Sequence, residues 1–352
     1  MKCEEQRVTR RTCLKAALAA AATGGLGLAR SASADAPASY PTARETFALR
    51  QQGKKIPVIF DTDIGGDIDD TWALAMLLKC PEFEIKLVAA DSGNAIYRAR
   101  LMAKLLEVAG RTDVPIAVGL GAADRASHQS KWIEGYSLDR YPGTVHQDGV
   151  DAIVQTIKKS ADPVTVVCIG AVPNIAEALR RAPDIVRNSR FVGMHGAIRR
   201  GYGNSDKPVP EANVRSDPAA LRTVFAAPWD CTITPLDTCG IVALSGAKYQ
   251  RVYDCQQPLI RALMENYRVW ITEPDWLTHR PDPAKASTTL FDTVAVYLAM
   301  GEDLVNMEDL PVRVTDDGMT VVDQSHRPIH CAMSWKDLGA FEDLLVERLV
   351  SG

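Results

Sequence analysis

The residues best placed to do chemistry form one short acidic segment, residues 61–70. Five carboxylates fall within these ten positions: Asp61, Asp63, Asp67, Asp69 and Asp70. Like charges packed this closely repel one another unless a cation binds between them. Oxygen ligands on a loop that contains glycine are the kind that Ca²⁺ and Mg²⁺ prefer. The segment therefore predicts a site for a divalent cation.

Two other motifs share part of this pattern. An EF-hand loop also has Asp at its first, third, seventh and ninth positions, but here Gly65 occupies the fifth position and Trp72 the twelfth, where ligands belong. Phosphatases of the haloacid dehalogenase type begin with Asp-x-Asp after a strand. They have Thr or Val where Gly65 stands, and the Asp69-Asp70 pair has no place in their pattern. The EF-hand is rejected, and the phosphatase remains a weaker alternative.

The elements around this loop alternate between strand and helix. Apolar runs predict strands at 56–60, 84–90, 114–118, 164–169, 189–194 and 231–235, and helices at 71–79, 98–109, 150–159, 174–181 and 218–225. Such alternation predicts an α/β fold, a mostly parallel central sheet flanked by helices in a single domain. Ligands of these sheets bind at the carboxyl ends of the strands, which is where the acidic loop begins.

Charge and composition favour a small-molecule partner. The 352 residues have a formal net charge of −4, and no basic run interrupts the chain after its first 34 residues. An acidic protein of this kind is not expected to bind nucleic acid. No segment is long and apolar enough to predict a membrane span.

The N-terminus predicts export rather than fold. Residues 9–15 resemble a twin-arginine signal, an apolar stretch follows at 16–28, and Ala32-Ser33-Ala34 fits a cleavage site. We therefore expect a signal peptide at 1–34, an N-terminal extension at 35–52 and a catalytic domain at 53–352, located in the periplasm or outside the cell. In an oxidising compartment Cys231 and Cys239 could form a disulfide, which the sequence leaves open.

From Pro57 onward the chain resembles the nucleoside hydrolase family. The family signature is present as Asp61-Thr62-Asp63-Ile64-Gly65 and then Asp69-Asp70-Thr71-Trp72-Ala73-Leu74, with two extra residues between its halves. Further matching strings follow in the family's order: Ser92-Gly93-Asn94, His146-Gln147-Asp148-Gly149, Gly170 to Asn174, Met194-His195-Gly196, Gly203-Asn204, Glu211-Ala212-Asn213, Asp217-Pro218 and Leu290-Phe291-Asp292-Thr293. The order and spacing of the strings together carry the resemblance.

The resemblance implies a calcium-dependent hydrolase that cuts the N-glycosidic bond of ribonucleosides. It assigns Ca²⁺ to the side chains of Asp63, Asp70 and Asp292 and to the backbone carbonyl of Pro173. Asp63 would also act as the base that takes a proton from a calcium-bound water. The ribose hydroxyls would be held by Asp69, Asn94, Asn204, Glu211 and Asn213. The family further implies a homodimer or homotetramer.

Several of these residues also have purely structural interpretations. Asn94 and Asn204 each follow a glycine and fit turns. Asn174 and Asp217 fit helix N-caps, and Asp237 fits a brace at the end of a strand. Asp61 would brace the loop through backbone N–H groups. Asp67, in the insertion, is either a solvent-facing acid or an extra ligand.

Phe291 departs from the family pattern. Many members have a histidine there that protonates the leaving base, and a purine-preferring branch has a tryptophan that stacks on it. Phe291 can stack but cannot donate a proton. Other candidate acids are His146, His195, Trp276, His279, Asp139 and Tyr141. The leading hypothesis is a purine-tolerant ribonucleoside hydrolase that salvages nucleobases. The alternatives are a calcium-containing riboside-binding protein and a hydrolase of another N-riboside whose leaving group needs no acid.

Overall fold

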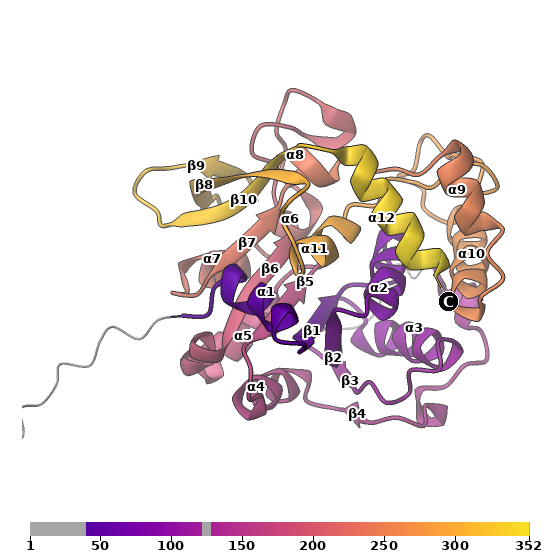
Figure 1. Ribbon diagram of the computed structural model, residues 1–352, viewed down its shortest axis with the longest axis horizontal. Coiled ribbons are helices and arrows are strands. Elements are labelled where there is room, and N and C mark those ends of the chain that lie inside the picture. The colour runs from indigo at the N-terminus through magenta and orange to yellow at the C-terminus, as the bar shows by residue number, and fades with distance from the viewer. Residues whose placement is uncertain (1–39, 122–127, 352) are drawn as a thin grey trace, which may run out of the picture. The chain divides into compact units, whose positions relative to one another are not determined.

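A ten-stranded sheet runs through the computed structural model, which describes residues 40–121 and 128–351 (Figure 1). The strand order is β4-β3-β2-β1-β5-β6-β7-β10-β8-β9. The strands are β1 (Ile56–Thr62), β2 (Phe83–Ala90), β3 (Ile116–Val118), β4 (Val145–His146), β5 (Val164–Cys168), β6 (Ser189–Met194), β7 (Cys231–Thr234), β8 (Val305–Val314), β9 (Thr320–Val322) and β10 (Pro328–Trp335). All pairings from β4 to β10 are parallel, whereas β8 pairs antiparallel with β10 and with β9. The predicted α/β fold with a mostly parallel sheet is confirmed.

Helices cover both faces of this sheet. They are α1 (Ala43–Gln51), α2 (Asp69–Lys79), α3 (Ala95–Val108), α4 (Gly149–Lys159), α5 (Pro173–Arg181), α6 (Ala212–Ser216), α7 (Pro218–Ala226), α8 (Leu236–Cys239), α9 (Gly246–Tyr253), α10 (Pro258–Trp270), α11 (Thr293–Leu298) and α12 (Leu338–Val350). Short 3₁₀ turns add η1 (Ser130–Ile133), η2 (Leu138–Arg140), η3 (Pro183–Asn188) and η4 (Tyr202–Asn204). The six predicted strands and five predicted helices are all present. The sequence patterns predicted no element after residue 235.

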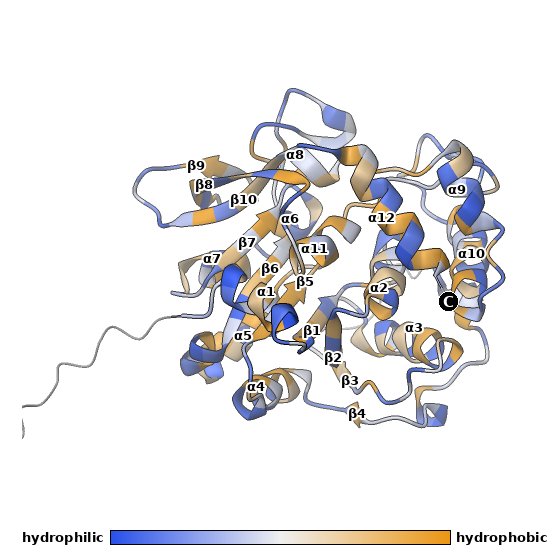
Figure 2. Cartoon of the chain, in the orientation of Figure 1, coloured by the Kyte–Doolittle hydropathy of each residue, from blue (hydrophilic) through white to orange (hydrophobic). Residues whose placement is uncertain are grey.

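Strand β1 lies in the middle of the sheet, and its side chains pack in two apolar clusters, one on each face. Val58 and Phe60 pack in one apolar cluster with α2, α3, α10, α11 and α12, whereas Ile59 packs in a second cluster with α4, α5 and α7. Successive side chains of a strand point to opposite faces, so a strand that is apolar throughout must be buried on both. Figure 2 shows the apolar residues gathered on the strands and on the inward faces of the helices.

Helix α1 packs onto the sheet domain. Thr42 and Glu45 form a reciprocal capping box at its start. The backbone N–H of Ala43 donates to Asp230 at 2.6 Å, and the guanidinium of buried Arg190 lies 5.1 Å from the ring centre of Phe47. Helix α1 falls within the expected N-terminal extension, 35–52, and the boundary at residue 53 stays a prediction. The predicted signal peptide, residues 1–34, lies outside the described residues.

Candidate active site

A cavity of about 820 Å³ opens at the carboxyl ends of the central strands. Its walls come from the loop after β1, from Ile169 after β5, from Met194 at the end of β6, and from segments far along the chain at 211–215, 276 and 291–292. This is the edge of the sheet at which the sequence predicted a ligand site. Six carboxylates line the cavity: Asp63, Asp67, Asp69, Asp70, Glu211 and Asp292.

Three of these carboxylates form a tight buried group. Oxygens of Asp69, Asp70 and Asp292 all lie within 4.8 Å of one another. Asp69 and Asp70 open helix α2, and Asp292 directly precedes α11. Burial, together with repulsion among these acids and Asp63, raises the pKa of all three well above the usual range. Buried carboxylate oxygens that repel one another are a donor set that fits a hard divalent cation.

Asp63 lies beside this group on the loop after β1. Its side chain is 29% exposed, and one carboxylate oxygen lies 3.9 Å from the buried guanidinium of Arg98. Arg98 also donates to the carbonyls of Ile64 at 2.8 Å and Ser92 at 2.9 Å, which ties the loops after β1 and β2 together. A side chain at Gly170 would meet the Cβ of Asp63 at 2.9 Å. The loop therefore holds Asp63 at the cavity surface, packed closely against Gly170.

Glu211 and Asn213 enter the cavity from the start of α6. The Glu211 carboxylate caps this helix by accepting from the N–H groups of Asn213 at 2.7 Å and Val214 at 3.2 Å, and it also accepts from Gly196 at 3.1 Å. Burial raises its pKa to about 7. The amide of Asn213 donates to the carbonyls of Ile169 at 2.9 Å and Met194 at 3.1 Å. These bonds fix both side chains, and among the described residues no hydrogen bond to the Asn213 oxygen is found.

Three predicted site residues lie outside the cavity lining. Asn94 caps α3, accepting from the N–H of Tyr97 at 3.0 Å. Asn204 is exposed at the end of η4 with a left-handed φ of 60°. Pro173 is the half-buried first residue of α5. Asn204 thus lies at the end of a short 3₁₀ turn, as its structural interpretation expected, whereas Asn94 is a helix N-cap rather than a turn residue. Their predicted contacts with ribose stay predictions, as does the Pro173 carbonyl ligand.

Two other structural interpretations need correction. Asn174 is the second residue of α5 and does not cap it: its amide donates to Asp61 at 2.8 Å and to the Ala90 carbonyl at 3.0 Å, and its oxygen accepts from Leu120 at 2.7 Å. Asp61 is correspondingly braced by side chains, Asn174 and the thiol of Cys168 at 3.3 Å, rather than by backbone N–H groups. Sequence position alone does not show that Asn174 turns back towards the sheet.

The structural interpretations of Asp217 and Asp237 are confirmed, and the structure answers whether Cys231 and Cys239 are paired. Asp217 caps α7 by accepting from Ala220 at 2.9 Å. Asp237 accepts from the N–H groups of Ile198 and Arg199 and so braces the loop after β6. Asp67 is half-buried and lines the cavity, and burial raises its pKa to about 7. Within the described part of the chain, Cys231 and Cys239 are buried free thiols.

The outer part of the cavity is aromatic. Phe291 meets Tyr202 edge to face with 5.9 Å between ring centres. Trp276 is 54% exposed and meets Trp270 in the same manner at 5.9 Å, while the Trp270 indole donates to the Gly66 carbonyl at 2.9 Å. The acidic base of the cavity suits a polyhydroxylated sugar and a cation, and the aromatic rim suits a planar group.

Sequence reasoning missed four cavity residues, Arg98, His128, Tyr202 and Arg215. Tyr202 directly precedes the Gly203-Asn204 string, and Arg98 interrupts an apolar helix, so both had a detectable signal. His128 and Arg215 lie in no recognisable motif. Of the acids considered earlier, Trp276 lines the cavity, but His146, His195, His279, Asp139 and Tyr141 do not.

Gly65 is a position where an added methyl group should distort the acidic loop. Its φ is +106°, and a Cβ would lie 2.5 Å from Cε1 of Tyr97 and 2.7 Å from Cδ1 of Leu101. We expect Gly65→Ala to lower the free energy of unfolding by about 1–3 kcal/mol, as overpacking does. Urea denaturation measures this, with Gly53→Ala as the control, because Gly53 has a φ of +73° and nothing within 4 Å. Equal losses in both variants would contradict the packing argument.

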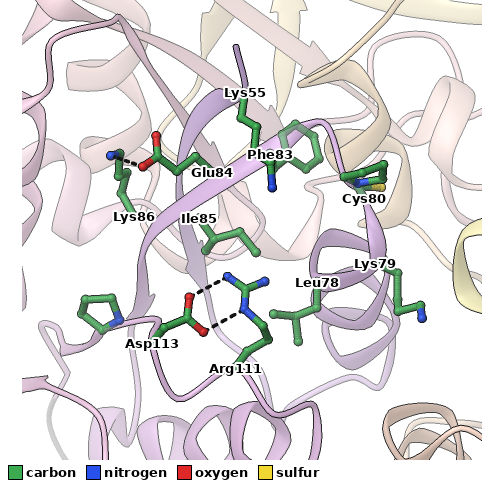
Figure 3. Close-up of a pocket in the computed structure, with 12 residues that line it drawn as sticks. Lys55, Leu78, Lys79, Cys80, Phe83, Glu84, Ile85, Lys86, Arg111 and Asp113 are labelled. Carbon is green, nitrogen blue, oxygen red and sulfur yellow. Dashed lines mark hydrogen bonds and ion pairs between the residues drawn. The ribbon is translucent and has the colours of Figure 1, made fainter. Parts of the chain in front are cut away.

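A second cavity, of about 630 Å³, lies at the opposite edge of the sheet, where β1 and β2 begin (Figure 3). Four of its charged side chains form two pairs: Arg111 donates twice to Asp113, at 2.8 and 2.9 Å, and Lys86 pairs with Glu84. No predicted site residue lines it. The chemistry therefore belongs to the cavity at the carboxyl ends.

The chain is similar to several known proteins. Residues 58–342 match the family described as inosine-uridine preferring nucleoside hydrolase. The pyrimidine-specific ribonucleoside hydrolase RihA of Salmonella paratyphi C is 28% identical over 319 residues, covering 84% of this chain and 98% of the relative. Two solved structures share the fold: a plant nucleoside hydrolase (TM-score 0.70, 21% identity, 84% and 99% of the two chains) and a purine-preferring ribonucleoside hydrolase from Gardnerella vaginalis (TM-score 0.68, 22% identity, 84% and 98%).

Proposed function

Since the chain belongs to the inosine-uridine preferring nucleoside hydrolase family, and is thus a hydrolase of N-glycosyl bonds, we propose that it converts ribonucleosides to ribose and free base with the help of Ca²⁺. The observation that carries the proposal is the buried group Asp69, Asp70 and Asp292, which shares one cavity with Asp63 and with Glu211. This arrangement offers oxygens for a cation, a carboxylate that can act as a base, and polar groups for a sugar.

The proposed roles follow from position. Asp63, Asp70 and Asp292 would hold the cation, which when bound supplies Lewis-acid activation of water and of sugar hydroxyls. Asp63 is the most exposed of the three and accepts the proton of the attacking water. Asp69 accepts from the ribose 2′ hydroxyl, and Glu211 and Asn213 bind the hydroxyls on the opposite wall.

The cation should matter more for stability at higher pH. Burial raises the pKa of Asp61 to about 6 and of Asp67 and Glu211 to about 7, and it also raises the pKa of Asp69, Asp70 and Asp292 well above the usual range. Groups with a raised folded-state pKa stabilise the fold at low pH, and that stability is lost as pH rises through the folded pKa. We therefore expect the Tm in EGTA to fall between pH 5 and pH 8.

Calcium binds the deprotonated carboxylates, so it should restore the Tm mainly at pH 8. Differential scanning fluorimetry at both pH values, in EGTA and in excess CaCl₂, measures the four Tm values. A calcium-induced rise that is equal or larger at pH 5 would contradict the assignment of the cation to these acids.

Because Phe291 cannot donate a proton, two alternatives stay open. The protein would be a riboside-binding protein, or a hydrolase of an N-riboside whose leaving group needs no proton. The edge-to-face pair of Phe291 and Tyr202 supports stacking against a base but supplies no acid in place of the family's histidine. Stacking favours purines over pyrimidines, because purines offer the larger ring surface.

The test is ribose release by the purified protein in Ca²⁺ from inosine, adenosine, guanosine, uridine and cytidine. We expect release, with purines ahead of pyrimidines, and Phe291→Ala should narrow that preference. The absence of release from all five, with calcium bound, would overturn the hydrolase proposal in favour of the riboside binder or of an unusual N-riboside substrate.

We also propose that the protein is exported by the twin-arginine route to the periplasm or beyond, and that it is a homodimer or homotetramer. The export proposal is supported by residues 9–34, with paired arginines, an apolar stretch and a cleavage site. In the part of the chain that the structure describes, no helix has the length and apolar character needed to cross a bilayer. The oligomer proposal is supported by the family resemblance alone, and sedimentation analysis tests it.

A further inference from the structure

We propose that His128 is the acid that protonates the departing base, the role that Phe291 cannot fill; the inference rests on the proposed nucleoside hydrolysis. The chain has six histidines, all within the described residues, and His128 alone lines the cavity. His195 is fully buried and bonded to the Gly170 carbonyl at 2.9 Å, and His146 and His279 are exposed outside the cavity.

The next residue fixes the backbone that carries His128. Gln129 is fully buried, and four hydrogen bonds join it to other segments of the chain. Its N–H donates to the Tyr97 hydroxyl at 3.0 Å, and its amide donates to the Asp67 carbonyl at 3.0 Å. Its oxygen accepts from Thr71 at 3.2 Å and from Asn266 at 2.7 Å. These bonds anchor the segment to the acidic loop and to helices α2, α3 and α10, so His128 has a defined place at the cavity.

His128 lies on the aromatic side of the cavity. Lys131, three residues further on, forms an ion pair with Glu273, which joins the segment of His128 to the segment that carries Trp276. Both His128 and Trp276 line the cavity. Glu273 lies close enough to His128 for an electrostatic interaction, and Lys131 lies three residues along the same segment. A sugar held at the acidic base of the cavity would direct its base towards this rim.

The other polar side chains of the rim are poorer proton donors. Burial raises the pKa of Tyr202, whose hydroxyl already accepts from the Ala212 N–H at 3.0 Å. The guanidinium of Arg215 does not deprotonate in proteins, and the indole N–H of Trp276 is a donor of hydrogen bonds only. Imidazole is the side chain whose proton exchanges readily near neutral pH.

The proposed step balances without a further reactant. As the C1′–N bond breaks, its electron pair passes to the base, and a ring nitrogen of the base takes the proton from the imidazolium of His128. The attacking water bonds to C1′ and gives a proton to Asp63. The products are ribose and neutral base, and the proton on Asp63 returns to His128 through solvent.

The test compares two ribosides that differ in their need for an acid. Inosine has a poor leaving group, whereas p-nitrophenyl riboside releases a stable phenolate that needs no proton. We expect His128→Ala to lower kcat on inosine by about 10²- to 10⁴-fold, with kcat on p-nitrophenyl riboside within a few-fold of wild type. His128→Gln, which keeps the size of the side chain, should behave in the same way.

His279→Ala is the matched control, since His279 is exposed outside the cavity, and it should leave both rates unchanged. Unchanged hydrolysis of inosine by both His128 variants would overturn the assignment, as would an equal loss on both ribosides, which indicates a structural role. A wild-type protein that releases ribose from no nucleoside would instead refute the proposed function, so the two failures are distinguishable.

Discussion

Replacing Asp63 with asparagine is expected to lower kcat/KM for inosine by about 10²- to 10⁴-fold, the usual contribution of a positioned base. Asparagine keeps the shape of the side chain but cannot take a proton from water. Asp63 is the carboxylate of the proposed cation set that is most open to the cavity, and one of its oxygens lies 3.9 Å from the guanidinium of Arg98. The measurement is ribose release across a Ca²⁺ titration, so that weaker binding of the cation is separated from loss of the base.

Asp139→Asn is the matched control for this prediction. Asp139 is an exposed carboxylate in η2, outside the cavity lining, and its loss should leave kcat/KM unchanged. If saturating Ca²⁺ restored wild-type activity to Asp63→Asn, Asp63 would serve only as a ligand, and the base would have to be sought among the other acids of the cavity.

The second large effect expected is discrimination against 2′-deoxynucleosides, by about 10⁴-fold in kcat/KM. Asp69 is buried beside Asp70 and Asp292, and a substrate without the 2′ hydroxyl leaves that carboxylate without its partner. The intrinsic reactivity of the N-glycosidic bond runs the other way, since deoxyribosides hydrolyse more readily in acid. A strong preference for ribose therefore has to come from the protein.

Inosine and 2′-deoxyinosine, compared in wild type and in Asp69→Asn, give the measurement. The variant should lose most of its activity on inosine and little on 2′-deoxyinosine, so the ratio should fall towards one. Asp139→Asn serves as the control, because Asp139 is an exposed carboxylate outside the cavity. A wild-type ratio near one would show that Asp69 does not bind the 2′ hydroxyl.

The sequence predicted the sheet and the acidic half of the site because local patterns encode both. Buried parallel strands are continuous apolar runs, and five acids at fixed spacing after one of them mark a ligand site. Asp292 could be predicted as a site residue only because the residues around it resemble a family motif. No local pattern indicates that residue 292 returns to the start of α2.

The features that the sequence did not predict depend on contacts between residues that are far apart in the sequence. No short stretch of sequence encodes such contacts. Strand β8 includes Pro311 and the charged residues Glu308, Asp309 and Arg313. This composition is typical of a loop and does not predict a strand. The anchoring of Gln129 depends on partners from four separate segments. Asn94 and Asn204 occur in recognisable strings but do not line the cavity, and their predicted contacts with ribose stay predictions.

The separation of Asp70 and Asp292 along the chain sets an order of events during synthesis. Strand β1 and helix α2 leave the ribosome long before the third carboxylate of the buried group has been made. Until then the loop holds neighbouring acids that repel one another, without the full set of oxygens for a cation. Any cation held by this group can therefore load only after α11 has been translated and has packed against α2. A cation at this group would then bind only after distant parts of the chain have packed together. Metal binding would therefore be a late step that follows folding, and it would not initiate folding.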